Sequence, residues 1–249
     1  MAAAPPPLGK YLGEVRALGA LASFLWSGAG AAADAHLPRG DGHPVIVYPG
    51  LLGSDLSTQA LRSRLAGLGY DVHGWGLGQN LGLRPDTLSE IRSQLVAVTR
   101  AAGRPASLFG WSLGGLFARE VAKRRPDCVR LVITAGTPCM GDLHATNAWR
   151  TYERLNRHAI DDPPIDIDLE TLPPVPVTSI YSEEDGIVSP GCADIGCGAR
   201  HETIRVDSTH IGLVWSAEVL AIAADRLAQG EGEWAPYTTG GAGHAASPL

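Results

Sequence analysis

The sequence predicts an α/β fold: a mostly parallel central sheet with helices on both faces and a short inserted cap. Short β-branched runs, typical of buried parallel strands, alternate along the chain with segments of helical periodicity. Hydrophobic residues make up 45% of the 249 residues, which is enough for a packed interior. A net charge of −6 gives no electrostatic footprint for nucleic acid or for an anionic membrane surface. We therefore expect one globular domain with no nucleic-acid partner.

The first 44 residues fit two interpretations. Apolar residues from Leu8 to Trp26 recur at spacings of three and four, which predicts an amphipathic helix docked on the domain. The same segment resembles a secretory signal, with an apolar run at 17–26 and a small-x-small site at 33–35. Glu14, beside that run, favours the docked helix and a cytoplasmic protein, whereas a cleaved signal would mean a secreted or periplasmic one. The sequence has no apolar run long enough to span a membrane.

Residues 45–229 are expected to form the domain itself. Its strands, each a short apolar run bounded by turn residues, are predicted at 45–48, 70–73, 106–109, 129–134, 175–181 and 203–206. Its helices, each with apolar residues on one face, are predicted at 58–68, 87–102, 116–125 and 212–228. Thr87 and Glu90 fit a capping box at the start of the second helix, Gly103 stops it, and Pro126 ends the third.

Two segments depart from this alternation. Residues 139–174 contain a polar, aromatic helix around 148–158 and a Pro/Asp-rich stretch, so we interpret them as an inserted cap. Residues 230–249 are rich in glycine and have no periodicity, which predicts a disordered tail.

A nucleophile is predicted where the third strand meets the third helix. The run Gly110-Trp111-Ser112-Leu113-Gly114 matches G-x-S-x-G in the strand-to-helix context that this motif requires. The sharp turn strains the central residue, while the small flanking glycines let neighbouring chain approach and the serine project above the sheet. The plain alternative is a Gly-rich turn. We predict that Ser112 is a nucleophile.

A serine hydroxyl needs a histidine base and a carboxylate that orients the base. His210 follows the last predicted strand and precedes an apolar helix, and Asp185 follows the strand before it. Glu183 and Glu184 are rivals for the acid, but the Asp-Gly pair turns more tightly. The chain order Ser112, Asp185, His210 is the Ser…Asp…His order of one known hydrolase arrangement.

Two backbone N–H groups are expected to bind an oxyanion. Leu113 supplies one, and Leu51 in the Gly-rich loop after the first strand supplies the other, with Leu52 as the next candidate. Side chains expected around a substrate are Leu52, Trp111, Trp149, Tyr152, Ile187 and Val188. For the aromatic residues of the cap, ordinary packing on the core is an equal alternative.

Cofactor signatures are incomplete. Cys192 and Cys197 could form a disulfide in an exported protein or remain free thiols. With His201 they lack both the tight pair and the fourth ligand of a zinc site, and the glycines of residues 74–82 do not complete a dinucleotide fingerprint. We expect neither a metal nor a cofactor.

Together these motifs resemble the α/β-hydrolase superfamily, and residues 45–55 and 107–137 look most like bacterial lipases and carboxylesterases. The run Pro49-Gly50-Leu51-Leu52-Gly53 corresponds to the lipase oxyanion loop with Pro in place of His, and Cys139 stands where a Gly-Thr-Pro-His turn has its His. The resemblance implies serine ester hydrolysis through an acyl-enzyme and does not specify the acyl group. We expect the substrate to be a small-molecule or lipid ester with an apolar acyl group. Acyl transfer, thioester hydrolysis, perhydrolysis or a non-catalytic binding role are the alternatives on this fold.

Overall fold

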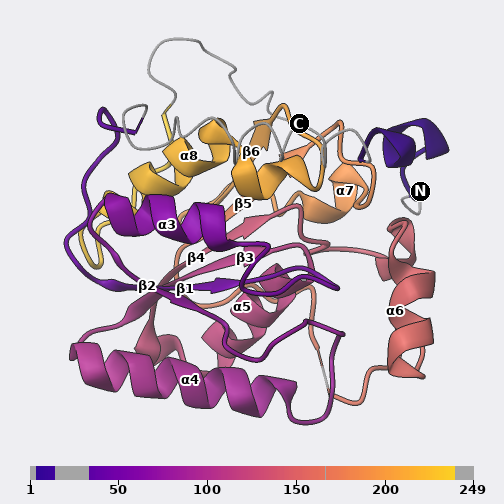
Figure 1. Ribbon diagram of the computed structural model, residues 1–249, viewed down its shortest axis with the longest axis horizontal. Coiled ribbons are helices and arrows are strands. Elements are labelled where there is room, and N and C mark those ends of the chain that lie inside the picture. The colour runs from indigo at the N-terminus through magenta and orange to yellow at the C-terminus, as the bar shows by residue number, and fades with distance from the viewer. Residues whose placement is uncertain (1–3, 15–33, 166, 239–249) are drawn as a thin grey trace.

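Six parallel strands form a single sheet in the order β2-β1-β3-β4-β5-β6 (Figure 1). The computed structural model describes residues 4–14, 34–165 and 167–238. The strands are β1 (Pro44–Tyr48), β2 (Asp71–Gly74), β3 (Ala106–Trp111), β4 (Val129–Ala135), β5 (Val177–Ser182) and β6 (His201–Val206). Each predicted strand is present, with its ends shifted by at most a few residues. The parallel sheet with helices around it confirms the predicted fold class.

The strand order places a crevice at the carboxyl ends of β1 and β3. The chain runs from β1 outward to β2 and then returns across β1 to β3, so the loops after β1 and β3 leave the sheet in opposite directions. Open parallel sheets bind ligands at such a switch point. The predicted oxyanion loop follows β1 and the predicted nucleophile follows β3, so the topology brings them to this crevice.

Helices cover both faces of the sheet, with α3 and α8 on one side and α4 and α5 on the other (Figure 1). The helices are α3 (Gln59–Gly67), α4 (Thr87–Ala102), α5 (Leu113–Arg124), α6 (Trp149–Asn156), α7 (Pro190–Ala193) and α8 (Ala217–Ala228). Short 3-10 turns are η1 (Pro126–Cys128), η2 (Leu143–Ala145) and η3 (Gly212–Trp215). No helix within the described ranges is both long and apolar enough to cross a membrane.

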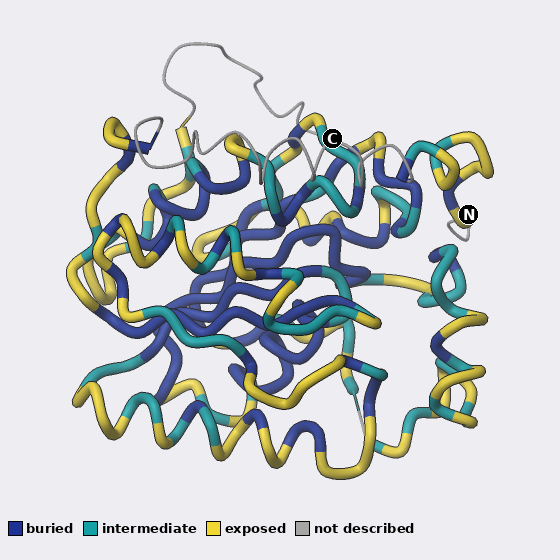
Figure 2. Tube along the Cα trace, viewed as in Figure 1, coloured by how far each residue is buried: buried dark blue, intermediate teal, exposed yellow. Residues whose placement is uncertain are grey.

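The core consists of two apolar layers separated by the sheet. Every residue of β1, β3 and β4 is buried, so these strands contact helices on both faces (Figure 2). Leu65 of α3 and Leu220 of α8 pack in one layer, and Ile91 of α4 and Phe117 of α5 pack in the other. Burying each such side chain contributes about 1.5–3 kcal/mol, which fixes the strand ends that carry the site.

Some predicted helix ends are wrong. The capping box does not form, because Thr87 is buried and its hydroxyl accepts a hydrogen bond from the Arg84 N–H (3.0 Å). The third helix begins three residues earlier than predicted, directly after Ser112. The last helix is divided into η3 and α8 at Ser216, whose side chain accepts from the Val219 N–H (3.3 Å).

The beginning of the glycine-rich tail, up to residue 238, contacts the domain. The Tyr237 N–H donates to a carboxylate oxygen of Glu202 on β6 (2.7 Å), and the Arg226 guanidinium lies 5.4 Å from the centre of the Tyr237 ring. Composition could not show these contacts, because two buried charged residues of the domain provide them. Residues 239–249 of the predicted tail lie outside the described residues.

The N-terminal segment is helical at residues 8–14. The apolar run at 17–26 lies outside the described residues. Asp34, in the small-x-small site, is buried and forms an ion pair with Arg64 of α3 (2.5 Å). Of the two cysteine alternatives the structure has free thiols: Cys192 is buried while Cys197 is exposed.

Candidate active site

Ser112 occupies a strained elbow between β3 and α5. Its φ of 55° and ψ of −126° are sparsely populated for a residue with a side chain, a conformation that costs about 1–3 kcal/mol. Three hydrogen bonds hold it: the Ser112 N–H donates to the Ala135 carbonyl (2.8 Å), and the Ser112 carbonyl accepts from the Gly115 N–H and the Thr137 hydroxyl (both 2.9 Å). The predicted nucleophile is thus fixed at the carboxyl end of the sheet.

The two motif glycines are needed because the backbone is crowded at the elbow. A Cβ atom on Gly110 would lie 2.3 Å from the Gly115 Cα atom, and one on Gly114 would lie 2.3 Å from the Tyr48 carbonyl oxygen. Both neighbours are main-chain atoms that cannot move aside. The absence of side chains at these two positions lets α5 begin close to β1, next to the oxyanion loop.

Asp185 and His210 form a buried pair at the ends of β5 and β6. The Asp185 Oδ2 atom lies 2.7 Å from the His210 Nδ1 atom, and the two residues are only 2% and 4% exposed. The other oxygen, Oδ1, accepts from the N–H groups of Ile187 (2.8 Å) and Val188 (2.7 Å). Both carboxylate oxygens are therefore engaged, and the imidazole is held with its Nδ1 toward the acid.

The surroundings of His210 favour its protonated form. Burial by itself lowers the pKa of this histidine, but the charge and hydrogen bond of Asp185, together with the charge of Glu14, outweigh burial and raise the pKa above 6.5. Glu14 was not among the site residues predicted from the sequence. The Trp111 ring, at a centroid distance of 5.8 Å, adds an uncharged neighbour.

The two predicted oxyanion donors, Leu51 and Leu113, line one cavity together with Ser112. Within the described residues neither of their N–H groups donates a backbone hydrogen bond, and that of Leu113 is one of the free donors at the start of a helix. The second candidate, Leu52, is excluded because its N–H donates to the Asn80 carbonyl (2.7 Å). The structure therefore favours Leu51.

Asn80 is a further supporting residue that sequence reasoning missed. It is fully buried, its side-chain amide donates to the Pro49 carbonyl (2.8 Å), and its backbone N–H donates to the Gly53 carbonyl (2.7 Å). It thus contacts both ends of the predicted oxyanion loop. An isolated Asn in a Gly-rich loop carries no local signal for this role.

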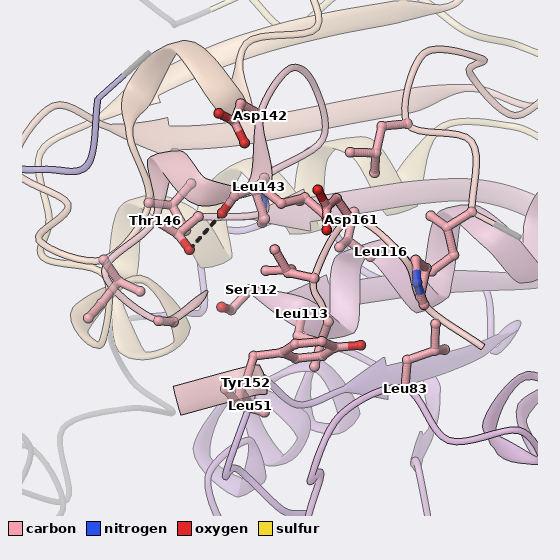
Figure 3. A pocket seen from close by; sticks show the side chains of 18 of the residues that line it. Leu51, Leu83, Ser112, Leu113, Leu116, Asp142, Leu143, Thr146, Tyr152 and Asp161 are labelled. Atoms are coloured by element: carbon pink, nitrogen blue, oxygen red, sulfur yellow. Dashed lines mark hydrogen bonds between the residues drawn. The ribbon is translucent and has the colours of Figure 1, made fainter. Parts of the chain in front are cut away.

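The cavity beside Ser112 has a volume of about 300 Å³ and a mostly apolar wall (Figure 3). Figure 3 shows Ser112 between Leu143 of the cap and the side chains of Leu51 and Tyr152. The charged side chains in this wall are two carboxylates, Asp142 and Asp161. The other apolar wall residues are Leu83, Leu113, Leu116, Pro138, Ala148, Ile160, Pro163, Ile167, Leu169, Ile187 and Val188.

Only part of the predicted substrate pocket lies on this wall. Tyr152, Ile187 and Val188 line the cavity, whereas Leu52, Trp111 and Trp149 are not among its lining residues. The physical reasons are that Leu52 is 48% exposed, that Trp111 is buried with its indole directed at His210, and that Trp149 packs on the His144 ring at 4.9 Å. Of the cap aromatics, only Tyr152 turns inward.

Asp41, His43 and Ser107 form a hydrogen-bonded Ser-His-Asp relay at the amino ends of β1 and β3. Asp41 Oδ1 is 2.5 Å from His43 Nδ1, and His43 Nε2 is 2.8 Å from the Ser107 hydroxyl. Ser107 and His43 are fully buried, and neither lines the cavity. Burial, the main influence, lowers the pKa of His43. This relay has the bonding pattern of a triad, but its serine and its histidine are closed off from solvent.

No protein-family model matches the chain. Among curated proteins, the pimeloyl-[acyl-carrier protein] methyl ester esterase of Yersinia pestis is 36% identical over 70 residues, and that of Xylella fastidiosa (strain M12) is 48% identical over 46 residues. These matches cover 28% and 18% of this chain. The matched segment spans about a quarter or less of the curated relatives, at 25% and 18% of their lengths.

Solved structures resemble the chain over most of its length. An α/β-hydrolase enzyme from a sediment metagenome of the Mar Chica lagoon, Morocco, has a TM-score of 0.56 at 18% identity, covering 75% of this chain and 91% of that one. Aspergillus fumigatus lipase B has a TM-score of 0.51 at 18% identity, covering 80% and 56%. An α/β-superfamily hydrolase from Oenococcus oeni has a TM-score of 0.51 at 17% identity, covering 75% and 91%. The chain therefore has the fold of the α/β-hydrolase superfamily, as its motifs predict.

Proposed function

We propose that this protein is a serine carboxylic ester hydrolase that acts through an acyl-enzyme on esters with an apolar acyl group. The observation that carries the proposal is the strained Ser112 elbow and the buried Asp185–His210 pair at the ends of parallel strands, with Ser112 opening into an apolar cavity. The curated relatives that match over short segments are methyl ester esterases, which agrees with this reaction class.

The reaction has two halves. In the first, His210 takes the Ser112 proton, the serine oxygen attacks the ester carbonyl carbon, and the Leu51 and Leu113 N–H groups bind the oxyanion. When the intermediate collapses, the bond to the alcohol oxygen breaks and the alcohol leaves with the proton from His210. In the second half, His210 takes a proton from water, the hydroxide oxygen attacks the acyl carbon, and the acid is released with Ser112 restored.

Asp185 has two roles in this scheme. Its hydrogen bond to Nδ1 keeps the imidazole in the tautomer whose Nε2 can accept a proton, and its charge stabilises the imidazolium that forms during attack. The raised pKa of His210 agrees with the second role.

The cavity wall indicates the substrate class. Apolar side chains line most of it, so an aliphatic acyl chain would be transferred from water to an apolar surface at about 25 cal/mol per Å² buried. Asp142 and Asp161 are its charged groups, which disfavours an acyl chain that ends in a free carboxylate. We infer that the substrate is an uncharged apolar ester.

Turnover of p-nitrophenyl esters tests the proposal. Wild type is expected to hydrolyse them, and Ser112→Ala to lose at least about 10³-fold in kcat. Equal rates in the two proteins would overturn the assignment. A series of acyl lengths, measured below and above substrate solubility, then separates an esterase from a lipase.

A further inference from the structure

Glu14 is buried deep in the molecule and binds three backbone N–H groups. It is 3% exposed and lies at the end of the described N-terminal helical segment, residues 8–14. Its Oε1 atom accepts from the N–H groups of Gly186 and His210, both at 2.8 Å, and its Oε2 atom accepts from that of Ile211 at 2.9 Å. A carboxylate with three such donors is held in one position by charge-assisted hydrogen bonds.

These three donors belong to the two loops that carry the acid and the base. Gly186 directly follows Asp185, while His210 is the base itself and Ile211 directly follows it. Glu14 therefore joins the loop after β5 to the loop after β6 through their main chains. The Asp185–His210 hydrogen bond joins the same loops through their side chains.

Other contacts dock the N-terminal segment on the acid loop. The Asn147 side-chain amide donates to the carbonyls of Pro6 (3.0 Å) and Gly186 (2.7 Å). A Cβ atom on Gly186 would lie 2.4 Å from the Lys10 carbonyl oxygen, so the two main chains touch. The Lys10 ammonium also pairs with Glu184 (3.5 Å). In Figure 1 this segment, coloured indigo, lies beside α6 and α7, two helices that come much later in the chain.

Burying an ionised carboxylate is costly unless it is bonded and balanced. Two carboxylates among the described groups raise the pKa of His210. They are Asp185 from the loop after β5 and Glu14 from the N-terminal segment. From β3, Trp111 contributes only an uncharged ring. Both carboxylates favour a positive imidazole, which is the state that forms when a serine proton is removed.

We infer that Glu14 is a positioning residue of this ester hydrolase: it fixes the Asp185 and His210 loops relative to each other, and its charge helps to stabilise the imidazolium formed during attack. The inference rests on the proposed function for its catalytic consequence. Glu14 itself contacts main-chain N–H groups rather than substrate, so its effect passes through His210.

Two substitutions distinguish the effect of the Glu14 charge from the effect of its side-chain length. Glu14→Gln keeps the length but removes the charge, and its amide group can no longer accept from one of the N–H donors. Glu14→Asp keeps the charge but is one methylene shorter. Glu184→Gln is the matched control, because it also removes a carboxylate from the loop after β5. The Glu184 side chain is 65% exposed and pairs with Lys10.

We expect kcat of Glu14→Gln to fall roughly 10- to 100-fold with little change in KM, since the cavity wall is intact. The acid limb of its kcat/KM profile is expected to move to lower pH. In Glu14→Asp we expect kcat to fall while the acid limb stays at the pH of wild type. Glu184→Gln should match wild type in both. A purely structural role would lower stability and leave the limb in place.

A measurement without turnover keeps the inference distinct from the proposed function. In an NMR titration of the imidazole, we expect His210 to become protonated at lower pH in Glu14→Gln than in wild type, and amide exchange at 186, 210 and 211 to accelerate. If the titration and the limb are both unchanged while Ser112→Ala is inactive, the role of Glu14 is overturned and the hydrolase assignment stands. If wild type hydrolyses no ester, the hydrolase assignment and the catalytic role of Glu14 fail together.

Discussion

The indole N–H of Trp111 donates a hydrogen bond to the carbonyl oxygen of His210, at 3.0 Å. Trp111 directly precedes Ser112, so this bond connects the elbow of the proposed nucleophile to the loop of the proposed base. The bond is buried, and the Asp185 and Glu14 carboxylates hold the same loop from other directions. The candidate catalytic groups are thus positioned before any substrate binds, as electrostatic catalysis of acyl transfer requires.

Asp185→Asn is expected to lower kcat about 10²- to 10⁴-fold, because an amide cannot both orient the imidazole and stabilise its positive form. Glu183→Gln and Glu184→Gln are matched controls in the same loop, where both side chains are more than half exposed. They should retain wild-type kcat. Equal losses in all three variants would refute the assignment of Asp185 as the acid. Steady-state kinetics on one p-nitrophenyl ester is sufficient.

The pH profile follows from the raised pKa of His210. The base works only in its neutral form, and the folded protein binds this proton more tightly than a free histidine with a pKa of 6.5 does. We therefore expect kcat/KM to fall as pH decreases, with an acid limb whose midpoint lies above 6.5. A limb at or below that value would contradict the influence of Asp185 and Glu14 on the imidazole.

Ser107→Ala tests whether the Asp41–His43–Ser107 relay is structural. Removing the hydroxyl leaves His43 Nε2 without its partner in a buried site, so the free energy of unfolding should fall by about 1–3 kcal/mol. Ester hydrolysis at a temperature where the variant is folded should match that of wild type. Urea denaturation and p-nitrophenyl ester turnover measure the two quantities. Loss of activity in a folded variant would contradict a purely structural role for this relay.

Gly114→Ala places a Cβ atom 2.3 Å from the Tyr48 carbonyl oxygen, so β1 and α5 must move apart. We expect the free energy of unfolding to fall by at least about 1–3 kcal/mol, together with most of the activity. Gly67→Ala in α3 is the matched control, since its Cβ would meet no atom within 4 Å. The control should be neutral or slightly stabilising. Denaturant unfolding of both variants measures the difference.

The predictable features of this protein are those encoded within about ten residues. A β-branched run ending in a turn marks a strand, and G-x-S-x-G between a strand and a helix marks an elbow. Asp185 and His210 were identified because each follows a strand, and parallel strands bring their carboxyl ends to one edge. The 2.7 Å bond between them agrees with that reasoning.

The features that sequence reasoning missed depend on partners far away in the chain. Glu14 and Asn80 are lone polar residues whose hydrogen-bond partners only the folded chain brings within reach. The predicted capping box does not form for a related reason. Thr87 is buried in the folded chain, and its hydroxyl accepts from the Arg84 N–H instead. The contacts of Glu14 also bear on the N-terminal segment, since cleavage at residues 33–35 would remove this carboxylate from the site.

The position of the acyl group during turnover shows whether Ser112 is the nucleophile. Rapid acid quenching of wild type with an activated apolar ester, followed by peptide mass spectrometry, should show one acyl group on the peptide that contains Ser112. The same experiment on Ser112→Ala should show none. An acyl adduct on another residue, or full turnover by Ser112→Ala without an adduct, would refute the assignment of Ser112 as the nucleophile.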